Sequence, residues 1–153
     1  MSGTARTLRA AAHAANYHGL QSGPRFIDTD GRLDLVAAIY LGATGRTPHA
    51  LGTSNDPTNP FNDLARLLIE TNEDVMNAIR AVSIAIGTEP PTDSETGEPC
   101  LIEHLWYWQI DRRMDTGTPP TAAETVGLLL RAANAEYART GTLAVALPSQ
   151  RAA

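Results

Sequence analysis

The abundance of alanine constrains the fold of this chain more than any other feature. Of its 153 residues 24 are alanine, against 16 leucine, eight isoleucine and five valine, and aromatic residues make up 5%. Small side chains let helices approach one another closely, whereas a sheet sandwich needs bulkier residues to fill its interior. We therefore expect an all-α fold, and a chain of this length is typical of a single domain.

Apolar residues recur at helical spacing in segments that end at glycine, proline or capping residues. These predicted helices are 4–18, 33–44, 60–70, 72–86, 101–114 and 121–139, where 60–70 and 72–86 are either two helices or one bent near Thr71. The predicted fold is a single compact, orthogonal or irregular bundle of five to six short helices over residues 1–153, with its core in 4–139. Residues 140–153 form a tail that either docks or frays, and Gly141 marks the end of the last helix.

Two predicted helices carry expectations about packing. The helix 101–114 is apolar over most of its surface, which is typical of a helix at the centre of a bundle. The helix 60–70 is expected to bury a stripe made of Phe61, Leu64, Leu67 and Leu68. Between the fourth and fifth helices, residues 88–99 are rich in proline and acidic residues and predict a surface loop.

Charge and cysteine content exclude several classes of protein. The formal net charge is -5, and all 12 basic residues are arginine without a basic stripe, so nothing attracts the chain strongly to nucleic acid or anionic lipid. The single cysteine, Cys100, excludes an intramolecular disulfide. No apolar run spans a bilayer and the first residues lack the apolar region of a secretory signal. We expect a cytoplasmic protein with no membrane partner.

Motifs for metals, cofactors and catalysis are missing from the sequence. Asp28 to Gly31 resembles part of a calcium loop, but aligning the glycine puts Phe26 at the first position and Ala37 at the twelfth, so a simple turn is expected. No zinc motif, phosphate-binding loop, dinucleotide motif or nucleophile elbow is present. We therefore predict no metal, no cofactor and no catalytic residue.

Three segments together resemble a known family. They are GRLDLVAAIYLGATG (31–45), HLWYWQIDRR (104–113) and TPPTAAETVGLLLRAA (118–133). The chain is similar, over roughly residues 4–139, to short proteins of unknown function from actinobacteria and their phages. The resemblance implies an intracellular setting, and it brings neither an activity nor a catalytic residue.

The surplus of apolar faces favours an interaction or regulatory module that binds a protein partner or a second copy, and the family resemblance implies an association with a phage or mobile element. The chain has more apolar residues on its helix faces than one small core can cover, Leu41 and Ile84 among them. The predicted interaction surface consists of Trp106, Tyr107, Leu128, Ala132 and Ala135. One alternative is a small enzyme with a pocket at His104, Trp108 and Asp111, although the spacing of His104 and Asp111 favours a solvated polar face. Another is a DNA-associated regulator that uses Arg112, Arg113, Arg131 and Arg139.

Overall fold

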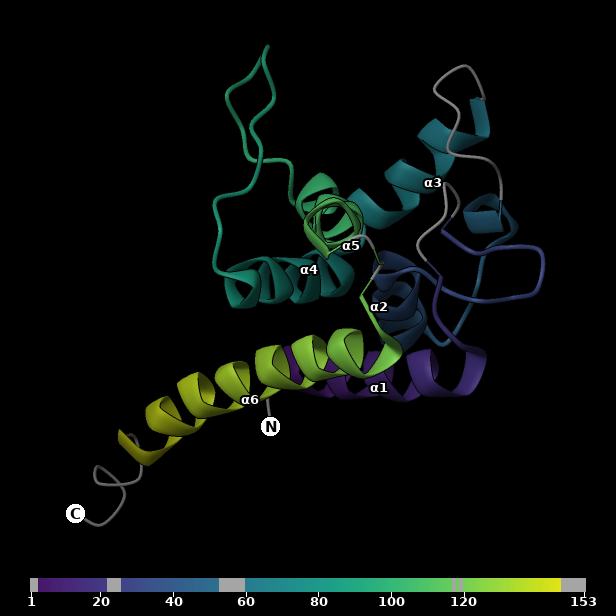
Figure 1. The fold of residues 1–153 in the computed structure, drawn as a ribbon. Helices are drawn as coiled ribbons and strands as arrows, with labels where there is room; N and C mark the ends of the chain where they lie inside the picture. Colours follow the sequence, from purple (N-terminus) through teal and green to yellow (C-terminus); the bar gives the residue numbers. More distant parts are fainter. Residues whose placement is uncertain (1–2, 22–25, 53–59, 117, 119, 147–153) are drawn as a thin grey trace.

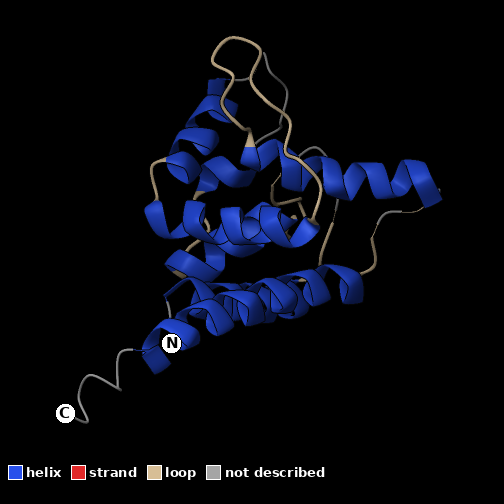
Figure 2. Ribbon diagram, turned by 90° about the vertical axis from the view of Figure 1, so that its left-hand side faces the viewer, coloured by secondary structure: helices blue, strands red, loops and turns tan. Residues whose placement is uncertain are grey.

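The computed structural model describes residues 3–21, 26–52, 60–116, 118 and 120–146, with the backbone alone for 60–63, 110–116 and 141–146. Within these residues the chain forms helices and no strand (Figures 1 and 2). The helices are α1 (Gly3–His18), α2 (Leu35–Thr44), the 3-10 helix η1 (His49–Gly52), α3 (Pro60–Glu70), α4 (Glu73–Ile86), α5 (Leu101–Thr116) and α6 (Ala122–Ala146). The predicted all-α bundle is confirmed. None of the described helices is both long and apolar enough to cross a membrane.

Side-chain caps fix the beginnings of three helices. Asp34 caps α2 by accepting a hydrogen bond from the Ala37 amide at 2.7 Å. Asn72 caps α4 in the same way, so residues 60–86 form two helices rather than one bent helix. Before α6, Thr121 and Glu124 exchange backbone-to-side-chain hydrogen bonds in the predicted capping box.

Small residues bring α1 and α2 into close contact. The two helices pack extensively against each other, and α6 also packs along α1 (Figure 1). A Cβ atom added at Gly42 would meet the Ala11 amide nitrogen at 2.6 Å and the Thr7 carbonyl oxygen at 2.7 Å. Because both obstacles are backbone atoms, only glycine fits at this crossing. The close α1–α2 crossing therefore depends on Gly42 as well as on the buried alanines of α1.

The centre of the bundle is α2, and the prediction that residues 101–114 occupy the centre is wrong. Every residue of α2 from Leu35 to Tyr40 is buried. By contrast, α5 packs mainly on α4 and α2, and its C-terminal part extends past the other helices (Figure 2). An apolar circumference therefore did not make α5 central. Among the α5 side chains that the structure describes, 101–109, the buried ones are Ile102, His104, Leu105 and Gln109.

Two further predictions about helices need correction. In α3 the buried residues are Ala65 and Ile69, whereas Leu64 and Leu67 are exposed, because α3 packs mainly on the short η1 and on α4; the side chain of Phe61 lies outside the described residues. The last helix does not end at Gly141 but continues to Ala146, so part of the predicted tail is helical. A glycine inside a helix costs only about 1 kcal/mol relative to alanine, which a long helix tolerates.

Candidate functional site

A groove runs beside the C-terminal half of α4. Its volume is about 540 Å³, and we name it the α4 groove. Its walls come from α4, from the segment 87–90 that follows it and from the segment that leads into α5, and its lining is formed by Met76, Arg80, Ser83, Ile84, Gly87, Thr88, Pro90, Glu98, Pro99 and Leu101. Ile84 is 71% exposed, although its side chain is large and apolar.

The segment 88–99 forms one wall of the groove and rises from the end of α4 as a narrow loop (Figure 1). Backbone hydrogen bonds close it: Asp93 donates to the Glu98 carbonyl at 2.8 Å, and Cys100 donates to the Pro91 carbonyl at 2.7 Å. The Asp93 carboxylate accepts hydrogen bonds from the Thr96 and Glu95 amides, which lower its pKa. The wall is therefore shaped by its own hydrogen bonds.

His104 contacts two residues that line the groove. Its Nδ1 lies 2.6 Å from Ser83 Oγ on α4, and its Nε2 lies 2.8 Å from Thr88 Oγ1 in the following segment. The residue is only 4% exposed, and burial lowers the pKa of its imidazole. A neutral imidazole has one donor and one acceptor nitrogen, so it can satisfy both hydroxyl groups. His104 thus ties α5 to the end of α4.

This geometry corrects the expectation that His104 lies on a solvated polar face. The helical spacing with Asp111 suggested exposure, but Ser83 and Thr88 cover the ring. Of the predicted pocket, Trp108 is partly buried against the core, and the side chain of Asp111 lies outside the described residues. Neither His104 nor Trp108 lines the α4 groove, although the two hydroxyl partners of His104 do.

The predicted interaction surface is only partly exposed. Leu128 and Ala132 are buried in the core, so their assignment to an exposed surface is wrong. They lie on the side of α6 that faces α1 and α4, which the sequence of α6 alone does not reveal. Tyr107 and Ala135 are exposed, and Trp106 is half-buried with its ring 5.8 Å from that of Tyr107. The sequence pattern did identify Ile84 as a surplus apolar residue, and the structure places it on the groove.

A second hollow of about 370 Å³ adjoins the groove, and we name it the acidic depression. The charged residues of its lining are Arg66, Glu70, Asp93, Glu98 and Glu103. Arg66 forms an ion pair with Glu103 at 3.5 Å, which links α3 to α5. Cys100 also lines the depression, and its thiol pKa is raised by burial and by the nearby charges of Glu103 and Asp93. A thiol with a raised pKa is a poor nucleophile.

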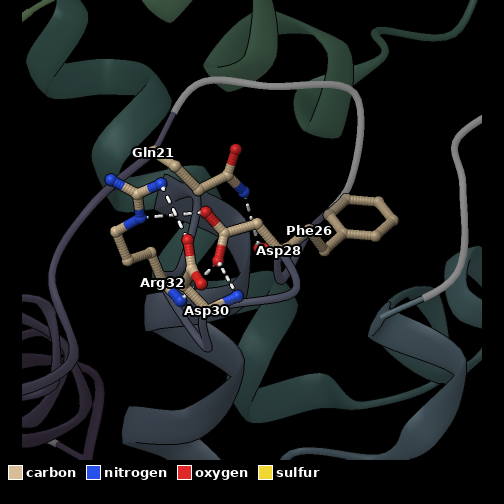
Figure 3. A network of polar contacts seen from close by, with 5 residues as sticks. All are labelled: Gln21, Phe26, Asp28, Asp30 and Arg32. Atoms are coloured by element: carbon tan, nitrogen blue, oxygen red, sulfur yellow. Dashed lines mark hydrogen bonds and ion pairs between the residues drawn. The ribbon is translucent and has the colours of Figure 1, made fainter.

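In the turn before α2, the carboxylates of Asp28 and Asp30 contact groups of the same turn (Figure 3). Asp28 accepts hydrogen bonds from the amides of Asp30 and Arg32 at 3.0 and 2.8 Å, and it forms an ion pair with the Arg32 guanidinium at 3.0 Å. The backbone and Arg32 thereby lower the pKa of Asp28 against the opposing effect of burial. Among the residues that the structure describes, no three His, Cys, Asp or Glu side chains form a group that could hold a metal ion.

Comparisons with known proteins add no assignment. No family model matches the chain, and no match was found among curated proteins or among solved structures.

Proposed function

We propose that this protein is a small interaction module and that the α4 groove binds a segment of a partner protein through a large apolar side chain. The observation that carries the proposal is the exposure of Ile84, 71%, at the edge of a concave surface that also includes Met76 and Leu101. Large apolar side chains exposed beside an apolar concavity are typical of docking sites.

The groove is already formed in the free chain. His104 fixes Thr88 at the start of the loop 88–99, and the backbone hydrogen bonds of residues 91–100 close the rest of that loop. A binding surface that is ordered beforehand loses less conformational entropy when a partner binds. This preorganisation supports a recognition role for the groove.

A larger hollow of about 820 Å³ lies near the end of α1, but it offers a weaker anchor. Its apolar residues are Tyr40, which is buried, and Leu41 and Leu68, which are partly buried against the core. These side chains already contact the rest of the bundle. The α4 groove is favoured because Ile84 remains largely uncovered by the chain.

The remaining elements of the proposal come from the sequence. We propose that the module acts in the cytoplasm, in an actinobacterium or in a cell infected by its phage. The family resemblance implies the intracellular setting and the source. The enzyme alternative has less support, because both nitrogens of His104 are engaged by Ser83 and Thr88 and the ring is buried. The DNA-associated alternative has less support because Arg139, one of its four arginines, forms an ion pair with Glu136 at 2.8 Å. The side chains of Arg112 and Arg113 lie outside the described residues.

A displayed library of random 12-residue peptides tests the proposal. Peptides enriched on the wild-type protein are synthesised with a fluorophore, and their affinities are measured by anisotropy against wild type, Ile84→Glu and Tyr17→Glu. Tyr17 is a matched control because it is 79% exposed and lies on α1, outside the groove lining. Circular dichroism checks that both variants remain folded.

We expect Ile84→Glu to weaken binding at least tenfold and Tyr17→Glu to change it less than twofold. Enrichment of no peptide, or equal binding by both variants, would contradict the proposal. Light scattering on the free protein tests whether a second copy of the chain occupies the groove instead. A dimer that Ile84→Glu dissociates would show that the groove binds a second copy, and it would replace the proposed partner.

A further inference from the structure

We propose that the partner segment carries an arginine or lysine beside its apolar anchor residue, so that the anchor lies in the α4 groove and the cation in the acidic depression. This inference rests on the proposed function of the groove. It names the chemistry of the ligand, a basic and apolar peptide segment, which the apolar groove alone does not specify.

The groove and the depression form one continuous surface. Both hollows are lined by Met76, Glu98, Pro99 and Leu101. The two hollows are therefore no further apart than the width of these residues. A residue docked against Met76 and Leu101 therefore has its sequence neighbours at the edge of the depression. Neighbouring side chains of one peptide can reach both hollows.

The charges in the depression favour a cation. Four carboxylates line it, those of Glu70, Asp93, Glu98 and Glu103, against the single guanidinium of Arg66. Arg66 is already engaged by Glu103 at 3.5 Å. The Asp93 carboxylate is held in its ionised form by two backbone amides. The lining therefore has an excess of negative charge that a guanidinium or ammonium group would complement.

Cys100 reports the same field from inside the depression. Burial raises the pKa of its thiol, and the charges of Glu103, Asp93 and Glu70 raise it further, against the opposing effect of Arg66. The sum of the neighbouring charges thus disfavours a negative charge at this sulfur. An acidic peptide would meet the same repulsion, which gives the site a preference by charge.

The single cysteine allows a test of the field without any partner. Cys100 is modified with a cationic and with an anionic methanethiosulfonate of similar size, and the ratio of the two rates is divided by the ratio for 2-mercaptoethanol. We expect a normalised cation preference of at least fivefold in low salt, which falls as salt is added. A normalised ratio at or below one would contradict the inferred field.

The decisive experiment uses the peptides selected on the wild-type protein. Each basic residue of a bound peptide is replaced by glutamine, and both peptides are measured against wild type, Glu70→Gln/Glu98→Gln and the control Asp30→Asn/Glu136→Gln. The control removes the same charge from residues outside the linings of the groove and the depression. Circular dichroism verifies the fold of each variant.

We expect the basic residue to strengthen binding at least fivefold on wild type and on the control, and less than twofold on Glu70→Gln/Glu98→Gln. Peptides that need Ile84 but bind equally with or without their basic residue would overturn this inference and leave the proposed function standing. Peptides insensitive to Ile84→Glu would instead overturn the proposed function. The two failures are therefore distinguishable.

Discussion

The beginning of α2 and the end of α4 are each fixed by one buried titratable side chain, but their surroundings differ. Asp34 is 1% exposed, accepts the Ala37 amide at 2.7 Å, and its own amide donates to the Phe26 carbonyl. The α2 residues that follow it are all buried as far as Tyr40. His104 is also buried, yet Thr88, to which it bonds, lies on an open groove.

The difference shows how similar polar contacts serve two purposes. Around α2, small residues such as Ala11 and Gly42 let the helices close on one another, so Asp34 stabilises an interior. Around α4, the larger residues Met76, Ile84 and Leu101 line a hollow that the chain leaves open, so His104 shapes a surface. Substitutions in the first region should therefore change stability, and substitutions on the surface of the second should change binding.

Gly42→Ala tests the closed region most severely. We expect a loss of about 3 kcal/mol in the free energy of unfolding, because the added methyl group meets backbone atoms of α1 that cannot move aside. Urea denaturation measures the change. Gly127→Ala is the control in α6, where the nearest obstacle is the mobile end of Arg131 at 3.5 Å, and it should stabilise the protein by about 0.5 to 1 kcal/mol. Equal effects of the two substitutions would contradict the close α1–α2 crossing.

His104→Ala tests whether the groove depends on its buried support. We expect a loss of about 2 kcal/mol, because the buried Ser83 hydroxyl loses its partner and a cavity forms. Peptide binding should weaken as well, since Thr88 is no longer held in place. Denaturation and anisotropy on the same variant measure both effects. A variant that loses stability but binds the selected peptide as wild type does would show that the groove does not need His104.

The pH dependence of stability is expected to be governed in opposite directions by the two buried groups. Burial raises the pKa of Asp34 from 3.8 to about 8, so between these values the folded protein holds a proton that the unfolded chain has released. The contribution of Asp34 is therefore complete below about pH 4 and is lost as the pH rises toward 8, at up to about 1.4 kcal/mol per pH unit. Burial lowers the pKa of His104, so its contribution is instead lost as the pH falls below 6.5.

Asp34→Asn isolates the first of these effects, because asparagine keeps the capping oxygen and cannot ionise. Denaturation at several pH values should show that the difference in stability between wild type and Asp34→Asn shifts against wild type from pH 5 to pH 7. The exposed Asp30→Asn is the control and should follow wild type more closely. A difference that stays constant with pH would show that Asp34 is ionised throughout this range.

Much of the fold follows from local sequence signals. Asn72, the Thr121–Glu124 pair and Gly87 act within a few residues of where they stand, so the sequence alone places these helix ends correctly. The alanine content likewise indicates close helix packing, which Gly42 and Ala11 provide. Such features need no knowledge of the tertiary structure.

The candidate site depends on residues that are distant in the sequence, and for that reason it was predicted only in part. The helical pattern of α5 places His104 on a polar face, but Ser83 and Thr88, which cover it, are 21 and 16 residues away. The prediction of which apolar residues are exposed fails for the same reason. Leu128 is covered by other helices, whereas Leu67 in α3 is not. Ile84 was correctly singled out because α4 has enough apolar residues to bury one face without it.

Ile84→Glu should have the smallest effect on stability, within about 0.5 kcal/mol, because the residue is largely exposed. Its effect on peptide binding should be the largest of the groove substitutions. Parallel denaturation and anisotropy curves give both numbers. A large loss of stability would mean that Ile84 supports the fold, which would remove the contrast between the two regions.

The most direct test of the account is a nuclear magnetic resonance titration of the isotope-labelled protein with a selected peptide. We predict that the largest amide shift changes occur at Met76, Ile84, Thr88 and Leu101, that Cys100 and Glu98 follow, and that Tyr17 and Tyr137 stay unchanged. The largest changes on α1 and α6, or none at the groove residues at saturating peptide, would contradict the assignment of the α4 groove as the binding site.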